Sequence, residues 1–341
     1  ASKRDHRKLG KSLGLFDFEQ NVGAGLPLWL PNGGRMRAKL ERILFKAHRK
    51  RGYEPIRSPE ILKSDAWIKS GHYENYKENM YFTTIDEQEY GLKPMNCVGH
   101  CEIFKKTPVT YKQLPLKFFE YGVVHRHELS GVMHGLFRVR EFTQDDAHIY
   151  CTKEQVKEVI LDTLEFIKSI MDVFGFSYEF SVSTRPQKAI GSDEFWESTT
   201  NAIKDALDEA NYKYDIDEGG GAFYGPKIDV KILDSMKRKW QCSTIQIDMN
   251  LPERLDINYI NNEGVKSRPV MVHRAILGSF ERFIGILIEH CGGELPLFIA
   301  PNAVVFVPIN NDEKTTKYIK QIQNELFHDD IGELTKFVEK G

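Results

Sequence analysis

A row of side chains that could bind an anionic, aromatic ligand lies within residues 136–150. If these residues form a strand, alternate side chains point to the same face, because successive residues of a strand point to opposite faces. A half-buried strand usually has one apolar face. Here one face carries two guanidinium groups, a phenyl ring, an amide, a carboxylate and an imidazole: Arg138, Arg140, Phe142, Gln144, Asp146 and His148.

A second extended run brings one more arginine to this row. Residues 117–126 are rich in strand-forming residues, and the segment 127–135 between the two runs contains Gly131 and Gly135. The two runs are therefore expected to form an antiparallel hairpin with a long loop. Arg126 lies at the end of the first strand, so we expect it near Arg138.

This combination of side chains suits a nucleotide. Arginine presents a planar fork to phosphate or carboxylate groups, and Phe142 offers a surface on which a purine can stack. A solvated sheet face with cross-strand ion pairs would explain the arginines equally well. The ring, amide, carboxylate and imidazole in the same row favour a binding site.

The rest of the chain predicts regular elements that can position these residues. Apolar spacing predicts a helix over 34–51 with Gly52 as its cap, then a short strand over 53–58 that ends before Pro59. Further helices are expected at 5–13, at 192–210 and at 152–174, where Thr152 and Gln155 form a capping box.

Strands are expected near 178–184 and in a hairpin with arms at 227–233 and 239–249. From residue 270, a short strand is expected to lead through His273, at a strand-to-helix junction, into a helix that contains Ile276 and Arg282. Residues 64–90 are polar, aromatic and irregular.

The composition limits the classes of protein to consider. A chain of 341 residues forms one large domain or two ordinary ones, and 41% hydrophobic with 28% charged residues is typical of soluble globular proteins. A net charge of −2 argues against coating nucleic acid by charge alone, so RNA contacts must come from local basic patches. No apolar run approaches the length of a membrane span, and the amino terminus does not resemble a signal peptide. Five cysteines without framework spacing indicate a reducing compartment. We expect a cytoplasmic protein with no membrane partner.

Four separated strings, in the right order, resemble the threonyl-tRNA synthetases, a family within class II of the aminoacyl-tRNA synthetases. They are KPMNCVGH at 93–100, RVREFTQDDAHIYC at 138–151, GGGAFYGPKID at 219–229 and VHRAILGSFERFIGIL at 272–287. The resemblance covers residues 4–310. It implies an α+β fold in which an antiparallel sheet is flanked by helices.

The resemblance also implies a domain organisation. Residues 1–295 resemble the catalytic domain, with motif 1 at about 34–59, motif 2 at about 117–148 and motif 3 at about 270–290. Residues 296–341 resemble part of the family's α/β anticodon-binding domain, with a strand followed by a helix over 312–327. They are too few for the whole domain, and we expect the amino-terminal editing domain to be absent from this sequence.

Individual roles follow from the resemblance alone. It implies catalytic roles for Arg126, Lys227 and Arg282, and a place near the tRNA terminus for His72. Threonine contacts fall on Gln144, Asp146, Tyr224 and Gln246. ATP contacts fall on Arg126, Glu128, Arg138, Phe142, Gln241 and Arg282, with Arg282 covering the adenine opposite Phe142. Gln241 and Gln246 have opposite strand parity, so both can face one pocket only if a β-bulge intervenes.

A metal site is also implied. Local spacing first draws attention to Cys97, His100 and Cys101, a weak candidate because a second close pair of ligands is missing. The resemblance instead selects Cys97, His148 and His273 as ligands of one Zn²⁺ per chain, with Mg²⁺ accompanying ATP. Three protein ligands leave room on zinc for the amine and hydroxyl of threonine. The family commonly has proline after this cysteine, whereas Val98 occupies the position here.

These observations predict an enzyme that activates threonine with ATP and transfers it to tRNA(Thr), and motif 1 implies a homodimer. A prolyl- or seryl-type relative would share the three motifs but not the set of Cys97, His148 and His273. A catalytically inactive relative that binds amino acids or RNA would typically lack a charged motif residue, and Arg126, Glu128 and Arg282 are all present.

Overall fold

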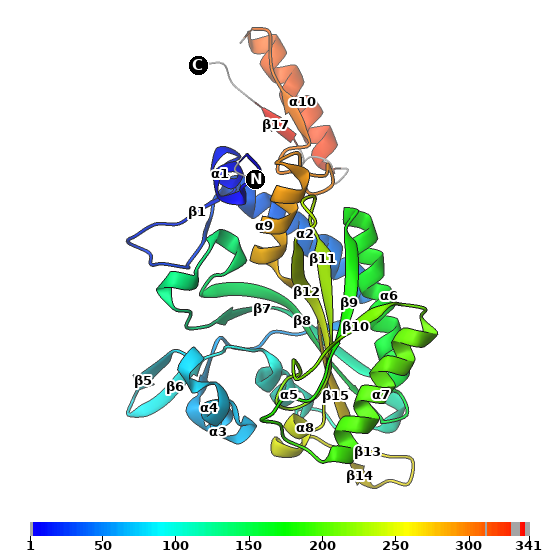
Figure 1. Ribbon diagram of the computed structural model, residues 1–341. Coiled ribbons are helices and arrows are strands. Elements are labelled where there is room, and N and C mark those ends of the chain that lie inside the picture. The colour runs from blue at the N-terminus through cyan, green and yellow to red at the C-terminus, as the bar shows by residue number, and fades with distance from the viewer. Residues whose placement is uncertain (1–2, 311, 329–334, 338–341) are drawn as a thin grey trace.

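The computed structural model describes residues 3–310, 312–328 and 335–337, and one eight-stranded sheet dominates it (Figure 1). In spatial order the strands are β10 (Tyr214–Asp217), β9 (Ser177–Ser183), β11 (Lys227–Leu233), β12 (Lys239–Asp248), β15 (Val270–Ser279), β8 (Glu141–Cys151), β7 (Leu116–His125) and β3 (Glu54–Pro55). Neighbouring strands are antiparallel except for the outermost pair at each edge. The predicted antiparallel sheet with flanking helices is confirmed.

Strands β7 and β8 form the predicted hairpin, paired from Leu116 opposite Tyr150 to His125 opposite Glu141. The second strand begins at Glu141, later than the predicted residue 136. The reason is a short 3-10 turn, η4 (Gly135–Phe137), in which Gly135 adopts a left-handed φ of 52°. Arg138 and Arg140 therefore precede the strand, and the alternating row begins at Phe142.

Helices α2 (Pro31–Lys50), α6 (Val156–Phe174) and α9 (Phe280–Cys291) share one hydrophobic core with one face of the sheet. Ala147 and Ile149 of β8 are fully buried in that core, and the rings of Phe174 and Phe283 join α6 to α9 at 5.0 Å. Helix α7 (Asp193–Glu209) packs beside α6 (Figure 1). Because side chains alternate, the polar residues of β8 point to the opposite face.

Helix ends follow local capping chemistry. Helix α2 begins at Pro31, three residues before the predicted start, because proline suits the first helical position. Helix α6 begins at Val156 with Gln155 as its cap residue, so the predicted capping box is only half formed: Gln155 Oε1 accepts from Thr152 N at 3.0 Å, but the Thr152 hydroxyl bonds to Glu154. Helix α7 has Ser192 as its cap, whose hydroxyl accepts from the Phe195 N–H.

Residues 61–104 form a smaller lobe, so the irregular reading of residues 64–90 is wrong. Its three-stranded sheet has the order β4 (Ile61–Lys63), β6 (Gln88–Leu92), β5 (Phe82–Ile85), and its helices are α3 (Ser64–Ser70), α4 (His72–Tyr76), η1 (Lys77–Asn79) and α5 (Cys97–Phe104). A second core around Trp67, Cys101 and Tyr150 joins this lobe to β8 and to α8 (Asn250–Arg254). These elements are too short for their periodicity to be visible in the sequence.

Strand β15 is longer than the sequence predicted, and this corrects the position of His273. The strand runs through Ser279 before α9 begins, so His273 lies in mid-strand instead of at a strand-to-helix junction, and Ile276 is a strand residue. Residues 270–277 of this central strand are all buried. Their continuous burial removes the alternation that identifies a strand.

The remaining elements are short or peripheral. They are α1 (His6–Ser12), β1 (Phe16–Asp17), β2 (Leu28–Trp29), η2 (Tyr111–Gln113), η3 (Ser130–Val132), β13 (Tyr259–Ile260), β14 (Lys266–Ser267), β16 (Val304–Phe306), α10 (Glu313–His328) and β17 (Thr335–Phe337). Strands β16 and β17 are parallel, and Figure 1 shows α10 projecting away from the main sheet. The rest of the predicted partial domain, 329–334 and 338–341, lies outside the described residues. Within the described part, no helix combines the length and the apolar character needed to cross a membrane.

Candidate active site

Two adjoining cavities form a cleft on the polar face of the sheet. Their volumes are about 330 Å³ and 370 Å³, and residues from β8, β12 and β15 line both, together with Arg126. We call the first the arginine end, which is also lined by Glu128, Arg138, Phe142, Gln241 and Arg282. We call the second the histidine end, which is also lined by Cys97, Asp146, His148, Tyr224, Lys227 and His273.

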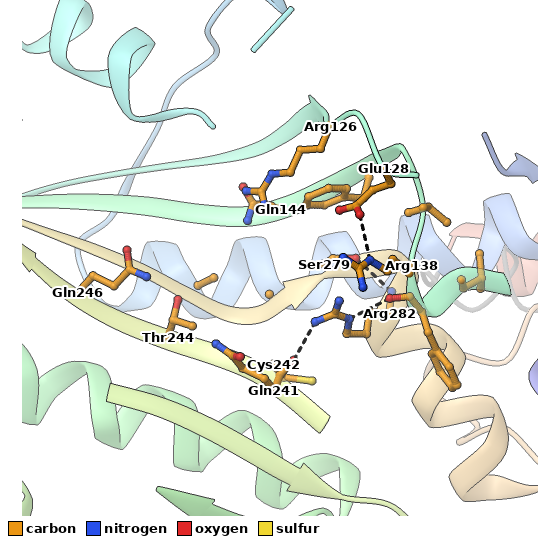
Figure 2. A pocket seen from close by; sticks show the side chains of 16 residues that line it. Arg126, Glu128, Arg138, Gln144, Gln241, Cys242, Thr244, Gln246, Ser279 and Arg282 are labelled. Carbon is orange, nitrogen blue, oxygen red and sulfur yellow. Dashed lines mark hydrogen bonds and ion pairs between the residues drawn. The ribbon is translucent and has the colours of Figure 1, made fainter. Parts of the chain in front are cut away.

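Three guanidinium groups converge on the arginine end (Figure 2). Arg126 Nε donates to the Pro94 carbonyl at 3.0 Å, and Arg138 Nε donates to Glu128 Oε2 at 3.0 Å. Arg282 Nε donates to the Phe137 carbonyl at 3.1 Å. Burial lowers the pKa of Arg282, with its neighbour Arg126 acting in the same direction. Three cations held this close to one another favour a polyanionic ligand.

An aromatic surface lies between these cations. The Arg126 guanidinium carbon is 5.0 Å from the centroid of the Phe142 ring, and both residues line the cavity with Arg282. Arg140 belonged to the predicted row, but its guanidinium bonds to the carbonyls of Glu128 and Ala24. Of the predicted row, Arg138 and the alternating residues from Phe142 to His148 therefore line the cleft, whereas Arg140 does not.

Strand β12 contains the β-bulge that Gln241 and Gln246 need in order to face the same pocket. Opposite β11 the register of β12 shifts, so that Val230 faces Ser243 while Lys231 faces Gln241, and Cys242 is the additional residue. Gln241 and Gln246 consequently both line the arginine end. Gly278 of β15 makes room for the bulge, since a Cβ on it would lie 2.4 Å from the Cys242 carbonyl oxygen.

Polar side chains of the histidine end are held by one another. Asn96 Nδ2 donates to Asp146 Oδ2 at 3.0 Å, and the Tyr224 hydroxyl donates to Gln246 Oε1. Lys227 pairs with the buried Asp229 at 2.8 Å. Burial raises the pKa of both Asp146 and Tyr224. The site thus offers fixed donors and acceptors to a small polar ligand.

Two histidines face each other at this end. His148 and His273 are direct partners in the ladder between β8 and β15, and His148 Nε2 lies 3.0 Å from His273 Nδ1. His273 Nε2 lies 2.8 Å from Asp248 Oδ2, and burial lowers the pKa of His148 well below its usual range. Neutral imidazoles with carboxylate support are typical metal ligands.

Cys97 lines the same cavity from the amino terminus of α5. Its sulfur lies 3.6 Å from His72 Nε2, and burial raises the pKa of the Cys97 thiol. Among the described residues, the Cys97, His148 and His273 ligand atoms do not all lie within 4.8 Å of one another. His72 is buried in α4, and burial lowers its pKa to about 4. It lines a small cavity with Cys97, Tyr224 and His273, and its place near the tRNA terminus stays a prediction.

Sequence reasoning missed three residues that support the site. Asp248 contacts His273, Asn96 contacts Asp146, and His100 Nδ1 lies 2.7 Å from His148 Nδ1. His100 had drawn attention only as part of the local cluster. Cys101 of that cluster points into the second core, with its sulfur near Tyr150 and Met271. Asp248 is the last residue of β12, and a carboxylate at the end of a cleft strand was the available signal for it.

Comparisons with known proteins agree with this geometry. Residues 81–291 match the family model described as the tRNA synthetase class II core domain (G, H, P, S and T). Threonine–tRNA ligase of Campylobacter hominis is 66% identical over 326 residues, which are 96% of this chain and 53% of that protein. The chain therefore spans about half the length of the curated relatives it matches.

Two solved structures resemble almost the whole chain. A crystal structure described as the RNA binding domain of threonyl-tRNA synthetase from Cryptosporidium parvum is 43% identical, with a TM-score of 0.94 over 99% of this chain and 84% of that one. A putative threonyl-tRNA synthetase from Aeropyrum pernix is 33% identical, with a TM-score of 0.82 over 95% of this chain and 78% of that one.

Proposed function

The chain belongs to the threonyl-tRNA synthetases of class II, and on this premise we propose that it joins threonine to tRNA(Thr) in two steps. In the first, the threonine carboxylate attacks the α-phosphorus of ATP, and pyrophosphate leaves as threonyl-adenylate forms. In the second, a hydroxyl of the terminal ribose attacks the acyl carbon and AMP leaves. The observation that carries the proposal is a single cleft with three arginines at one end and a cysteine–histidine set at the other.

The arginine end would bind ATP. Phe142 offers a ring on which adenine can stack, and Arg282 would cover its other side. Arg126 would bridge the reacting carboxylate and the α-phosphate, while Arg138 and Glu128 hold the nucleotide. No side-chain nucleophile is required, because the substrate carboxylate attacks directly. Catalysis then depends on positioning and on stabilising the charge that develops on phosphorus, with Lys227 assisting.

The histidine end would bind threonine beside the α-phosphate. Asp146 and Gln144 would accept from the amine or hydroxyl, and Tyr224 with Gln246 would close the other side. Gln144 and Gln246 line both cavities, so they lie where the two substrates would meet. His72 lies further along the same end, on the side from which we propose the tRNA terminus approaches.

We propose that Cys97, His148 and His273 hold one Zn²⁺, and the donor set supports this assignment. Two ring nitrogens 3.0 Å apart need a proton or a cation between them, because two lone pairs repel. Asp248 supports His273 from behind, as carboxylates commonly support metal-bound histidines. A cation would also offset the burial that raises the pKa of the Cys97 thiol. When bound, zinc supplies a Lewis acid that accepts the amine and hydroxyl of threonine.

Two further parts of the proposal concern magnesium and assembly. Mg²⁺ would accompany ATP and offset the charge of its phosphates. A homodimer is proposed because α2 and β3 lie where the family's motif 1 builds a twofold contact, and Phe45 on α2 is 41% exposed. Sedimentation at micromolar concentration tests this directly, and a monomer would contradict it.

Threonine-dependent exchange of labelled pyrophosphate into ATP tests the proposed function. Exchange requires the adenylate and does not require tRNA, so it does not depend on anticodon recognition. We expect exchange that depends on threonine. Binding of both substrates without exchange would instead support the inactive, synthetase-like alternative.

A further inference from the structure

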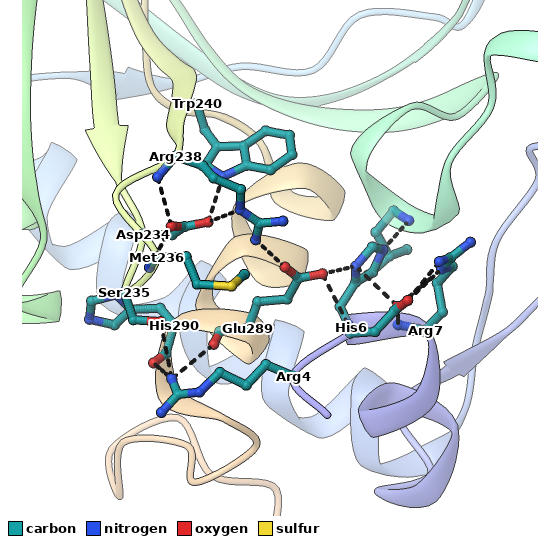
Figure 3. Close-up of polar contacts among 12 residues, drawn as sticks. Arg4, His6, Arg7, Asp234, Ser235, Met236, Arg238, Trp240, Glu289 and His290 are labelled. Atoms are coloured by element: carbon teal, nitrogen blue, oxygen red, sulfur yellow. Dashed lines mark hydrogen bonds and ion pairs between the residues drawn. The ribbon is translucent and has the colours of Figure 1, made fainter. Parts of the chain in front are cut away.

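Helix α1 lies outside the residues matched by the family model, yet it packs against the turn that leads into the arginine end. His6 of α1 is fully buried between this turn and α9. Figure 3 shows His6 directed at Glu289 of α9, beside an ionic group that continues through Arg238 to Asp234. A fully buried polar side chain such as His6 needs hydrogen-bond partners.

The hydrogen bonds of His6 fix its proton. The Leu136 N–H donates to His6 Nε2 at 3.0 Å, and a backbone N–H can only donate. Nε2 is therefore unprotonated, and Nδ1 carries the proton that it donates to Glu289 Oε1 at 2.7 Å. Burial lowers the pKa of His6, which keeps the ring neutral. His6 thus bonds to the turn through Nε2 and to α9 through Nδ1.

The turn is shaped to receive this ring. Gly135 has φ of 52°, and a Cβ on it would lie 2.2 Å from His6 Nε2. The ring of Phe137 is 4.1 Å from that of His6 and 4.2 Å from that of Trp240. Gly285 of α9 also lies against Phe137, since a Cβ there would be 2.9 Å from the phenyl ring. Residues 135–137 are therefore held on three sides.

The same turn also positions two arginines of the cleft. The Phe137 carbonyl accepts from Arg282 Nε at 3.1 Å, and Arg138 is the next residue along the chain. We propose that His6 is a positioning residue for the nucleotide: through Leu136 and Phe137 it sets where Arg282 and Arg138 meet ATP. The inference rests on the proposed assignment of the arginine end to ATP.

A metal site is the other reading of this cluster, because ligand atoms of Asp5, His6 and Glu289 lie within 4.8 Å of one another. The ligand atoms of these three residues already bond to other protein groups. Asp5 pairs with Arg7 at 2.6 Å, Glu289 pairs with Arg238, and both ring nitrogens of His6 are bonded. The cluster is satisfied by protein groups and serves as an anchor for α1.

Two substitutions test the roles of the two ring nitrogens of His6 separately. His6→Gln places a carbonyl oxygen near the position of Nε2 and can still accept from Leu136, whereas His6→Asn can reach only Glu289. Equilibrium dialysis with labelled ATP, and separately with threonine, measures each end of the cleft. We expect His6→Asn to weaken ATP binding about tenfold, as for one lost buried hydrogen bond, and His6→Gln to restore most of it. Threonine binding should be unchanged in both.

A matched control and a second variant complete the test. Arg4 bonds to the Glu289 and His290 carbonyls at the end of α9 and does not contact the turn. Arg4→Ala should lower the melting temperature and leave ATP binding unchanged. Gly135→Ala displaces the turn from His6 without altering the histidine itself, so it should weaken ATP binding even if His6→Asn fails to fold.

Equal ATP binding by His6→Asn and the unaltered chain would overturn the positioning role, as would equal losses for the asparagine and glutamine variants. A loss of threonine binding as large as the loss of ATP binding would also overturn it. If the unaltered chain bound no ATP, the assignment of the arginine end would fall as well. The two failures are therefore distinguishable.

Discussion

The two ends of the cleft differ in how their side chains are held. At the histidine end, His148 and His273 are paired residues of adjacent central strands, and both are buried. At the arginine end, Arg126 and Arg138 lie in the loop of the hairpin, Arg282 lies in the first turn of α9, and Arg126 and Arg282 bond to backbone carbonyls. The strand-held end is preformed for a small ligand, whereas the loop-held end can adjust to a larger one.

Burial sharpens this contrast. Burial raises the pKa of the Cys97 thiol and lowers that of His148, so burial disfavours the charged form of both groups. The arginines of the other end keep their charge, because a guanidinium does not lose its proton in proteins. In the proposed function a cation completes the histidine end and an anion completes the arginine end, so substitutions should affect the two ends separately.

The largest effect is expected from Arg126→Ala. This guanidinium is proposed to touch both reacting groups, so its loss should lower kcat/KM for adenylate formation by about 3–5 kcal/mol. Zinc content should not change, because Arg126 is not a proposed ligand. Arg140→Ala is the matched control, since Arg140 bonds to the carbonyls of Glu128 and Ala24. Exchange by Arg126→Ala within tenfold of the unaltered chain would rule out this role.

Cys97→Ala tests the histidine end. It should lose the metal and nearly all threonine activation, because the Cys97 thiolate is the proposed anionic ligand. ATP binding should remain, since the arginine end is intact. Cys101→Ala is the control, because its sulfur lies in the second core near Tyr150. Elemental analysis measures the zinc content of each variant. Zinc retained by Cys97→Ala and lost by Cys101→Ala would show that Cys101 is the ligand.

A smaller effect is expected where the two ends share strand β12. Gly278→Ala would place a Cβ in a left-handed backbone, φ 83°, against the Cys242 carbonyl of the bulge. We expect a loss of roughly 1–3 kcal/mol in the free energy of unfolding and weaker ATP binding, because Gln241 shifts. Denaturant titration and dialysis measure these two quantities. If the variant is destabilised but binds ATP as before, the bulge does not position residues for nucleotide binding.

Much of this arrangement was predictable from sequence, for identifiable reasons. The polar row from Phe142 to His148 was visible because its alternation is local. Strand parity showed only that Gln241 and Gln246 could share one pocket if a bulge intervened, and the structure contains that bulge. His273 was misplaced because a strand buried on both faces loses its alternation. Two contacts join residues far apart in the chain, that of His6 with Leu136 and that of His148 with His100, and no local sequence pattern predicts them.

Pyrophosphate exchange with threonine, serine and valine tests the central claim most directly. Valine matches threonine in shape but lacks the hydroxyl, and a site built to bind that hydroxyl should reject it by roughly 10⁴ to 10⁵. Serine keeps the amine and the hydroxyl and lacks one methyl group, a difference of only about 1–3 kcal/mol. We expect strong exchange with threonine, measurable exchange with serine and almost none with valine. Comparable exchange with valine and serine would contradict a histidine end that recognises its ligand through the hydroxyl.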